Sequence, residues 1–265
     1  MSSSDATSLR QLPVLGTPLL VTRYDELIGE CRRWAAAPGV MAIEFTNTQI
    51  VTKRRVEPEF RALTSACDFF APDGMPLIWC LNARGARMAD RVYGPTFMRE
   101  CLRSTPAPVK HYLIGGSAEL GERLRAVIRQ WNPDIQIVGS CHGQFDVDGR
   151  LKDGGDDALL TEINSLSPDF IWVGLGTPKQ QAWIHRHKHR LTRGVLLGVG
   201  FGFDVNAGTK RDAPEWMQRR GLTWLFRLAT EPRRLAGRYF KYNSLFVLYL
   251  LWDALRGKSG KTQCL

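Results

Sequence analysis

Asp73 is the carboxylate best placed for acid–base chemistry in this chain. It follows the apolar segment 67–72, which is typical of a short strand, and precedes Gly74 and a helical pattern over residues 75–84. In a parallel sheet, a side chain at this point faces the edge where the strands end, and it can act there as a general base. The residues alone leave a second interpretation open, in which Asp73 only caps the following helix.

Glycines gather at three further strand ends. The segments are "IGGS" at 114–117, "GLGT" at 174–177 and "GVGFGFD" at 198–204. Glycine lets the backbone approach a ligand closely, so we expect these ends to shape a binding pocket. The candidate substrate-binding residues there are Gly115, Gly116, Gly174, Gly176 and Gly200, with Asp204 at the rim either as a second carboxylate or as a helix cap.

A helical pattern begins directly after the second of these segments. We predict that Thr177 caps this helix, that Pro178 is its first residue, and that Lys179 and Gln180 direct polar groups into the gap. Free N–H groups at a helix N-terminus favour an anion, so the gap is predicted to hold a phosphate or diphosphate. The alternative is an ordinary strand–helix turn. Neither the dinucleotide-binding fingerprint nor a Walker loop occurs in the chain.

Three more polar patterns have residue types that can bind a ligand or a metal ion. Arg91, in "DRVYGPTFM" at 90–98, is a candidate substrate-binding residue, with surface ion pairing as the alternative. The Asp-x-Asp in "FDVDGR" at 145–150 can hold a divalent metal, but Asp-Gly there favours a turn. His185 and His189 are four residues apart, yet no third ligand accompanies them. We predict no metal site and no cofactor.

The elements that must position these residues indicate an α/β fold. Short apolar runs alternate with longer helical patterns, which is typical of a doubly wound, mostly parallel, Rossmann-like sheet. We predict a flexible tail at 1–12, an α/β catalytic domain at 13–210, and a continuous helical, basic appendage at 211–265.

Most of the positive charge lies in the C-terminal appendage. The net charge is +10, and residues 210–265 contain 12 Lys or Arg against 4 Asp or Glu. Such a patch favours nucleic acid, a phosphorylated ligand or an anionic membrane as partner. The apolar run at 245–252 is far shorter than the about 20 residues that span a bilayer, and the N-terminus has no signal-peptide pattern. The six scattered cysteines form no Cys-x-x-Cys pair, which fits a reducing cytoplasm.

Four motifs together resemble those of the WecG/TagA/CpsF family, glycosyltransferase family 26. They are "APDGMPLIW" around Asp73, "DRVYGPTFM" around Arg91, "VGLGTPKQQAW" around Gln180, and "GFGFDVNAGTKRDAPEWMQRRGLTWLFRLATEPRRLAGRY" from Gly200 onward. The resemblance runs in order from about residue 14 to 250, nearly the whole chain.

The resemblance implies transfer of a sugar from a UDP-sugar to a lipid-diphosphate-linked saccharide in the synthesis of a bacterial surface polysaccharide or exopolysaccharide. It implies an inverting, metal-independent reaction, with Asp73 as the base and Gln180 at the active site. The acceptor would be carried on a polyprenyl diphosphate at the cytoplasmic face of the plasma membrane. The appendage would bind the anionic membrane and bring Arg227, Arg233 and Arg234 over the site. The sequence is compatible with a homo-oligomer and does not set the number of subunits.

Two positions depart from the family pattern. Many members have Glu after the Pro-Lys-Gln motif, where this chain has Gln181. Many members have Thr-x-Asn at the first strand end, where this chain reads Phe45-Thr46-Asn47. Asn47 is kept and Thr46 is displaced by one position, and both are carried over as substrate-binding candidates. The departures predict a subgroup with its own sugar.

Two other functions remain open from the residues alone. A nicotinamide-dependent oxidoreductase would use the same fold, but the glycine spacing is wrong for it. A nucleic-acid-binding module would use the basic appendage, but its aromatic residues lie among aliphatic ones, which favours lipid. The aromatic stripe Tyr239, Tyr242, Phe246 and Tyr249 has near-helical spacing, and it either sits at a membrane interface or packs on the α/β core.

Overall fold

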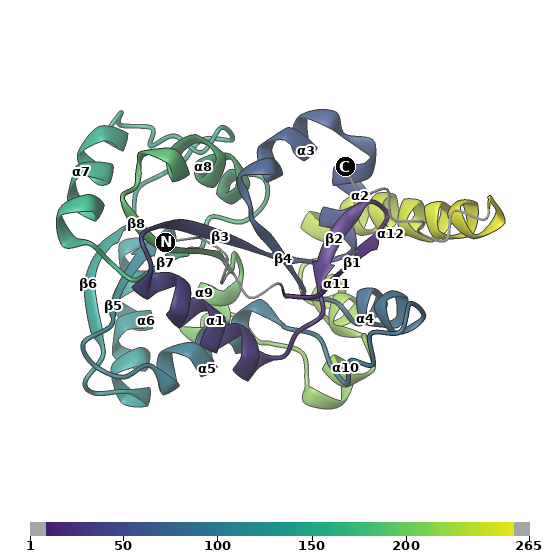
Figure 1. Ribbon diagram of the computed structural model, residues 1–265, viewed down its shortest axis with the longest axis horizontal. Helices are drawn as coiled ribbons and strands as arrows, with labels where there is room; N and C mark the ends of the chain where they lie inside the picture. Colours follow the sequence, from purple (N-terminus) through teal and green to yellow (C-terminus); the bar gives the residue numbers. More distant parts are fainter. Residues whose placement is uncertain (1–8, 257–265) are drawn as a thin grey trace, which may run out of the picture.

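The structure, a computed structural model, describes residues 9–256 of the 265-residue chain (Figure 1). Within them, one eight-stranded sheet has the order β1-β2-β4-β3-β8-β7-β5-β6. All neighbouring strands are parallel except β1 and β2, which form an antiparallel hairpin. The predicted fold class is therefore confirmed. The strands are β1 (Gln11–Val14), β2 (Thr17–Leu20), β3 (Gly39–Thr46), β4 (Phe69–Pro72), β5 (Lys110–Ile114), β6 (Gln136–Cys141), β7 (Phe170–Val173) and β8 (Arg193–Gly198).

Helices cover both faces of this sheet (Figure 1). Neighbouring residues of a strand point to opposite faces, so Ile171 and Trp172 of β7 belong to two separate apolar cores. Burial on both faces explains why the central strands are apolar throughout. The core around Trp172 is closed by α1 (Tyr24–Ala36), α5 (Gly94–Ser104), α6 (Ala118–Trp131) and α9 (Gly202–Asn206). The core around Ile171 is closed by α2 (Thr48–Val56), α4 (Met75–Asn82), α7 (Asp156–Leu166) and α8 (Lys179–His187), while α3 (Pro58–Leu63), η1 (Thr64–Ala66) and η2 (Lys188–Arg190) complete the connections.

The C-terminal region forms three helices rather than the continuous helix that the sequence predicted. They are α10 (Glu215–Arg219), α11 (Thr223–Thr230) and α12 (Pro232–Leu255). Gly221 separates the first two with a φ of 72°, and a Cβ at this position would lie 3.0 Å from the Cβ of Met75. Glycine is thus needed both for the turn and for the close approach to α4. Pro232 then opens α12, where proline is tolerated because the first N–H groups of a helix have no partner.

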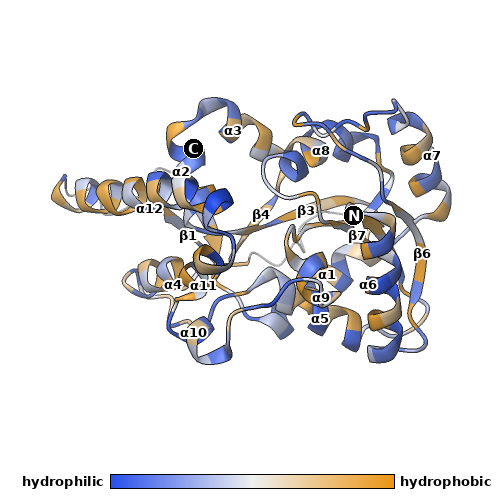
Figure 2. Cartoon of the chain, turned by 180° about the vertical axis from the view of Figure 1, so that it is seen from behind, coloured by the Kyte–Doolittle hydropathy of each residue, from blue (hydrophilic) through white to orange (hydrophobic). Residues whose placement is uncertain are grey.

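Helix α12 packs along α2 and extends beyond the sheet (Figure 1). The Thr48 hydroxyl donates to Asn243 Oδ1 at 2.9 Å, and Arg55 binds both carboxylate oxygens of Asp253 at 2.7 and 3.1 Å. These polar contacts lie ten positions apart on α12, so they fix its direction as well as its place. Figure 2 shows hydrophobic residues along the part that extends beyond the sheet.

Regular secondary structure begins closer to the N-terminus than predicted. Strand β1 begins at Gln11, inside the segment 1–12 that was expected to be a loose tail, and Leu9 is already buried. Residues 1–8 and 257–265 lie outside the described residues, so the rest of the predicted tail and the end of the predicted appendage lie there as well.

Candidate active site

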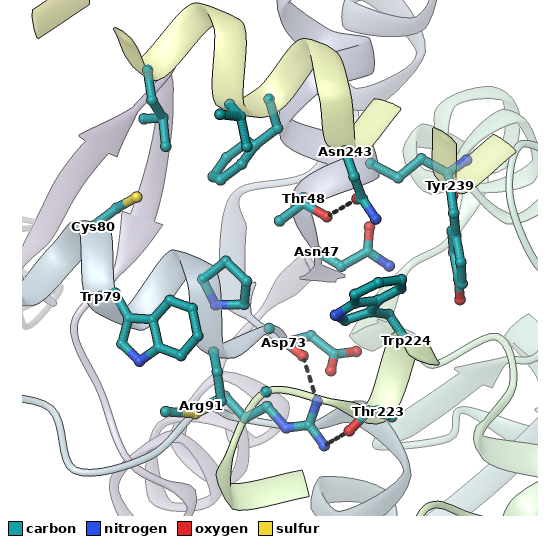
Figure 3. A pocket seen from close by; sticks show the side chains of 18 of the residues that line it. Asn47, Thr48, Asp73, Trp79, Cys80, Arg91, Thr223, Trp224, Tyr239 and Asn243 are labelled. Atoms are coloured by element: carbon teal, nitrogen blue, oxygen red, sulfur yellow. Dashed lines mark hydrogen bonds between the residues drawn. The ribbon is translucent and has the colours of Figure 1, made fainter. Parts of the chain in front are cut away.

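A cavity of about 1100 Å³ lies between the carboxyl ends of β3 and β4 and the C-terminal helices (Figure 3). One part of its lining is polar and the other is apolar. The polar part includes Asn47, Thr48, Asp73, Arg91, Thr223, Arg227 and Asn243. The apolar part comes from α4 and α12 and includes Met75, Pro76, Trp79, Phe246, Val247 and Leu250.

Asp73 lies at the polar end of this cavity (Figure 3). Its backbone N–H donates to the carbonyl of Thr46 at 2.7 Å, which ties the end of β4 to the end of β3. Gly74 occupies the N-cap position of α4, and no side chain caps that helix. The interpretation of Asp73 as a helix cap is therefore wrong, and its carboxylate is left for the cavity.

Burial in the surrounding protein raises the pKa of Asp73 from 3.8 to about 7. The positive charge of Arg91, a hydrogen bond with the backbone of Gly94 and the charge of Arg227 all lower the pKa, while Asp212 raises it. Burial has the largest effect, and it raises the pKa because it disfavours the charged form of the carboxyl group. A carboxylate with this pKa is half deprotonated near neutral pH, which suits a general base.

Arg91 is buried and joins the α/β part of the chain to the C-terminal helices. Its guanidinium donates to the carbonyl of Asp73 at 3.4 Å, to Gln218 Oε1 at 3.3 Å and to the Thr223 hydroxyl at 3.0 Å. It also lies over the ring of Tyr93, 4.1 Å from the centroid. The surface ion-pair interpretation of Arg91 is therefore wrong.

Thr46 is the last residue of β3 and Asn47 follows it, and the two side chains differ in what they contact. Asn47 lines the cavity and caps α2, because its Oδ1 accepts from the N–H of Ile50 at 3.2 Å. Thr46 is fully buried, and its hydroxyl donates to the carbonyl of Glu44 at 3.0 Å. Of the two candidates, the structure brings Asn47 to the cavity and places Thr46 behind it.

The three arginines expected over the site separate in the structure. Arg227 of α11 lines the cavity and lies over the ring of Phe201, 4.0 Å from the centroid. Its Nε is buried and, among the described residues, has no hydrogen-bond partner. Arg233 and Arg234 begin α12 and are exposed, and Arg234 forms an ion pair with Glu231. The cavity lining does not include Arg233 or Arg234.

Three of the candidate glycines serve packing instead of opening a pocket. A Cβ at Gly115 would lie 2.8 Å from the carbonyl oxygen of Gly174, and one at Gly116 would lie 2.8 Å from Leu120. A Cβ at Gly174 would meet the ring of Phe203 at 2.7 Å. Protein atoms already fill the space on the side of these glycines where a side chain would stand, so a ligand has no room there.

Gly176, in contrast, faces open space, while Gly200 lies against Gln180, whose Oε1 would be 3.2 Å from a Cβ at position 200. A Cβ at Gly176 would meet nothing within 4 Å, and one at Gly200 would lie 3.7 Å from the Cα of Gly176. Helix α8 begins here at Lys179, one residue later than predicted, and Thr177 does not cap it. The ammonium of Lys179 donates to the carbonyl of Phe145 at 2.6 Å and is not directed into the gap as expected.

Gln180 is buried beside a carboxylate that the sequence did not single out. Its Nε2 donates to Glu44 Oε1 at 3.0 Å, and Gln181 Nε2 donates to the same oxygen at 2.7 Å. Glu44 lies within apolar β3, and burial raises its pKa from 4.5 to about 8. The only signal in the sequence was a lone acidic residue inside an apolar strand.

Asp204 lies in the first turn of α9 and pairs with Lys210 at 3.7 Å, so it is not the cap of that helix. Asp146 forms the predicted turn, because its Oδ1 accepts from the N–H groups of Asp148 and Arg150 at 2.9 and 2.8 Å. Within residues 9–256, no group of three or more His, Cys, Asp or Glu side chains is placed to hold a metal ion.

The aromatic stripe on α12 faces the protein. Tyr242 and Phe246 are buried, and Tyr249 packs against the core. The interpretation in which this stripe lies at a membrane interface is wrong. The exposed apolar side chains of α12 are instead Phe240, Val247, Leu248, Leu251, Trp252 and Leu255. Among the described helices, none has the length and hydrophobicity to cross a membrane.

Most of the residues that line the cavity escaped the sequence analysis, and four of them stand out. Thr223 and Trp224 come from α11, Trp79 from α4 and Asn243 from α12. Trp79 and Trp224 keep 55% and 41% of their surface exposed, so the cavity is open to solvent beside both of them. Apolar helices gave no indication of which side chains would face a ligand, because that depends on how α4, α11 and α12 pack.

Comparison with known proteins identifies relatives over almost the whole chain. The family model described as "Glycosyl transferase WecG/TagA/CpsF family" matches residues 12–260. A Staphylococcus aureus protein named N-acetylglucosaminyldiphosphoundecaprenol N-acetyl-beta-D-mannosaminyltransferase is 25% identical over 89% of this chain and 91% of its own length. A Bacillus spizizenii protein of the same name is 30% identical over 71% of this chain and 70% of its own length.

These matches and the geometry of the cavity agree. The motifs around Asp73 and Arg91 meet at one polar site, and the C-terminal motif supplies Thr223 and Arg227 to it. The family model is described as one of glycosyl transferases, and both relatives are named as transferases, which favours that function over an oxidoreductase or a nucleic-acid-binding module. The chain is a glycosyltransferase and belongs to the WecG/TagA/CpsF family.

Proposed function

We propose that this enzyme transfers a sugar from a UDP-sugar to a saccharide linked to a polyprenyl diphosphate, with inversion and without a metal ion. One observation carries the proposal: the carboxylate of Asp73, with a pKa of about 7, faces a cavity whose other wall is apolar. A base and a lipid-compatible surface in one cavity fit an acceptor that carries both a sugar hydroxyl and a hydrocarbon chain.

The reaction is a single displacement. Asp73 accepts the proton of the acceptor hydroxyl while the hydroxyl oxygen forms a bond to the anomeric carbon of the donor sugar. The bond from that carbon to the diphosphate of UDP breaks, and UDP leaves with the electron pair. Attack from the face opposite UDP inverts the anomeric centre. The base is matched to neutral pH, so proton transfer contributes to the rate there.

The leaving diphosphate needs positive charge or N–H donors. Arg227 offers a guanidinium whose Nε has no partner among the described residues, and arginine binds phosphate oxygens in pairs. Arg233 and Arg234 follow Arg227 in the sequence and are exposed, and they supply further positive charge as the lipid substrate approaches. The open space at Gly176, beside Gly200 and the start of α8, is proposed to receive the donor.

The acceptor lipid is proposed to follow the apolar wall between α4 and α12. Met75 and Trp79 of α4 and Phe246 and Leu250 of α12 line this part of the cavity. The exposed apolar residues of α12, with the positive charge of the C-terminal region, would hold the enzyme on an anionic membrane at its cytoplasmic face. The names of the two relatives support such an acceptor, since both act on N-acetylglucosaminyldiphosphoundecaprenol.

The test is direct transfer in vesicles. The purified enzyme would be mixed with N-acetylglucosaminyldiphosphoundecaprenol in anionic vesicles and with UDP-N-acetylmannosamine, and then with other UDP-sugars. Mass spectrometry would give the mass of the lipid product, and NMR would give its anomeric configuration. Addition of one sugar residue, with the opposite anomeric configuration to the donor, is expected. Absence of transfer from every UDP-sugar, together with absence of UDP binding by calorimetry, would reject the proposal.

A further inference from the structure

The carboxylate of Glu44 is enclosed by two glutamine side chains. Glu44 is 1% exposed, and its Oε1 accepts from Gln180 at 3.0 Å and from Gln181 at 2.7 Å. Its Oε2 accepts from Gln180 Nε2 at 3.2 Å. An acidic side chain is rarely buried without partners, and the two amides satisfy this one.

The neighbouring strand leaves room for this arrangement. Gly198 of β8 pairs with Glu44 of β3, and a Cβ at Gly198 would lie 2.8 Å from Glu44 Oε2 and 3.0 Å from Gln180 Nε2. Any larger residue at position 198 would displace the carboxylate or the amide. The strand pair β3–β8 is therefore shaped around the contact between Glu44 and Gln180.

The orientation of the Gln180 amide is fixed twice. Its Nε2 donates to Glu44 and also to the carbonyl oxygen of Gly198, at 3.1 Å. A carbonyl can only accept, so turning the amide over would set two oxygens against each other. This holds whether Glu44 is charged or neutral. A neutral Glu44 can donate to Gln181 instead, whose amide is free to turn because its second partner is the hydroxyl of Thr177.

Two buried acceptors, Gln180 Oε1 and Gln181 Oε1, have no hydrogen-bond partner among the described residues. A turn of the Gln181 amide toward a neutral Glu44 satisfies Gln181 Oε1, whereas the fixed orientation of the Gln180 amide leaves Gln180 Oε1 unused. Gln180 Oε1 lies 3.2 Å from the point where a Cβ of Gly200 would stand, and the Cα of Gly176 lies 3.7 Å from the same point. The side of Gly176 is open. A buried acceptor without a partner costs about 1–3 kcal/mol, so a site of this kind calls for a donor.

We propose that Glu44 is a positioning residue, which holds the Gln180 amide so that Oε1 accepts a hydrogen bond from a hydroxyl or N–H group of the donor sugar at the opening beside Gly176 and Gly200. This rests on the proposed function, because it assigns the donor sugar to that opening. Glu44 acts through Gln180 and does not itself touch the substrate. Its effect is on recognition of the sugar and not of UDP.

The test is a pair of exchanged side chains. Glu44→Gln removes the carboxylate at nearly constant volume. Gln181→Glu places a second carboxylate beside the first, where Gln181 Nε2 now donates to Glu44 Oε1 at 2.7 Å. The double variant Glu44→Gln/Gln181→Glu restores one carboxylate and two amides, with the acceptor oxygen at position 44 available to Gln180 Nε2. Calorimetry would give the Kd of UDP and of the UDP-sugar for each protein, and thermal unfolding would verify that each is folded.

We expect each single variant to weaken UDP-sugar binding about tenfold or more, to leave the Kd of UDP within about twofold, and to be largely rescued in the double variant. Equal weakening of UDP and UDP-sugar, or absence of rescue in a folded double variant, would overturn the role of Glu44. If the wild type binds UDP-sugar but transfers no sugar, the proposed function fails while the binding data still decide the role of Glu44. If the wild type binds neither nucleotide, both proposals fail.

Discussion

The guanidinium of Arg91 donates a hydrogen bond of 3.0 Å to the hydroxyl of Thr223, across 132 positions of the chain. The same guanidinium reaches the carbonyl of Asp73 at 3.4 Å. A single buried side chain thus connects the backbone of the proposed base to the start of α11, which also carries Arg227. The site is therefore assembled from two parts of the chain that are joined by Arg91.

Replacement of Arg91 should uncouple these two parts. Arg91→Ala removes three hydrogen bonds from a charged donor, and each is worth about 1.5–3 kcal/mol at most. We expect a lower melting temperature and a fall in kcat of about tenfold or more. Arg84→Ala is the matched control, because Arg84 also lines the cavity but is exposed. Equal losses in both variants would contradict a specific role for Arg91.

Replacement of the proposed base should abolish transfer and spare nucleotide binding. Asp73→Asn keeps the shape of the side chain and removes its capacity to accept a proton at neutral pH. We expect kcat to fall about 10²–10⁴-fold, while calorimetry gives an unchanged Kd for UDP. Asp134→Asn, at an exposed position, serves as the control. Unchanged turnover in Asp73→Asn would remove Asp73 from the mechanism.

The rate of transfer should rise with pH through neutrality. The pKa of Asp73 is about 7, so the deprotonated fraction increases between about pH 6 and 8 and then levels off. The measurement is kcat/KM over this range, with an apparent pKa near 7 expected for the free enzyme. A rate that is flat down to pH 5 would show that the working carboxylate is an ordinary exposed one.

Stability should fall between about pH 6.5 and 8. Burial raises the pKa of Glu44 to about 8 and that of Asp73 to about 7 in the folded state, both above their ordinary values. The folded protein therefore holds more protons than the unfolded chain in this range, and above about pH 7 the difference comes mainly from Glu44. The free energy of unfolding then decreases as pH rises. His111 and His187, whose pKa values are lowered to about 4, change stability only below this range. Calorimetric melting of wild type and Glu44→Gln should show the decline in the first and a flatter curve in the second.

Binding to anionic vesicles should depend on the exposed face of α12. Leu248 and Leu251 are 60% and 57% exposed, and burial of a leucine is worth about 1.5–3 kcal/mol. The double variant Leu248→Asp/Leu251→Asp is therefore expected to reduce cosedimentation with vesicles at least tenfold. Val147→Asp is the control, since Val147 is 66% exposed on another part of the molecule. A double variant that still sediments with vesicles would place the membrane contact elsewhere.

Removal of divalent metal should leave transfer intact. In the proposed mechanism, Arg227 and the backbone at the start of α8 stabilise the leaving diphosphate, which a metal ion does in other enzymes. Excess EDTA should then change the initial rate by less than about twofold. If EDTA abolished activity, and if Mn²⁺ restored it in the wild type but not in Asp146→Asn, the Asp-x-Asp pattern would be revived as a metal site.

Much of the fold followed from the sequence because local patterns are decided locally. The strand predicted within the apolar segment 67–72 is β4, which begins two residues later, and the helix predicted over residues 75–84 is α4, which ends at Asn82. Asp73 was found because a carboxylate after a strand and before Gly74 has few local roles. The motif that contains Arg91 also predicted a residue that lines the cavity.

Tertiary structure decided what each of these side chains does. Thr46 and Asn47 are neighbours, yet only Asn47 reaches the cavity, since adjacent residues at the end of a strand point in opposite directions. The aromatic stripe of α12 faces inward because α2 offers it a packing surface, which periodicity cannot reveal. Glu44 and Gln180 are 136 positions apart, and only the pairing of β3 with β8 brings them together. Residue type and spacing determined the fold class and the family of this protein, whereas contacts between distant segments decided the geometry of its site.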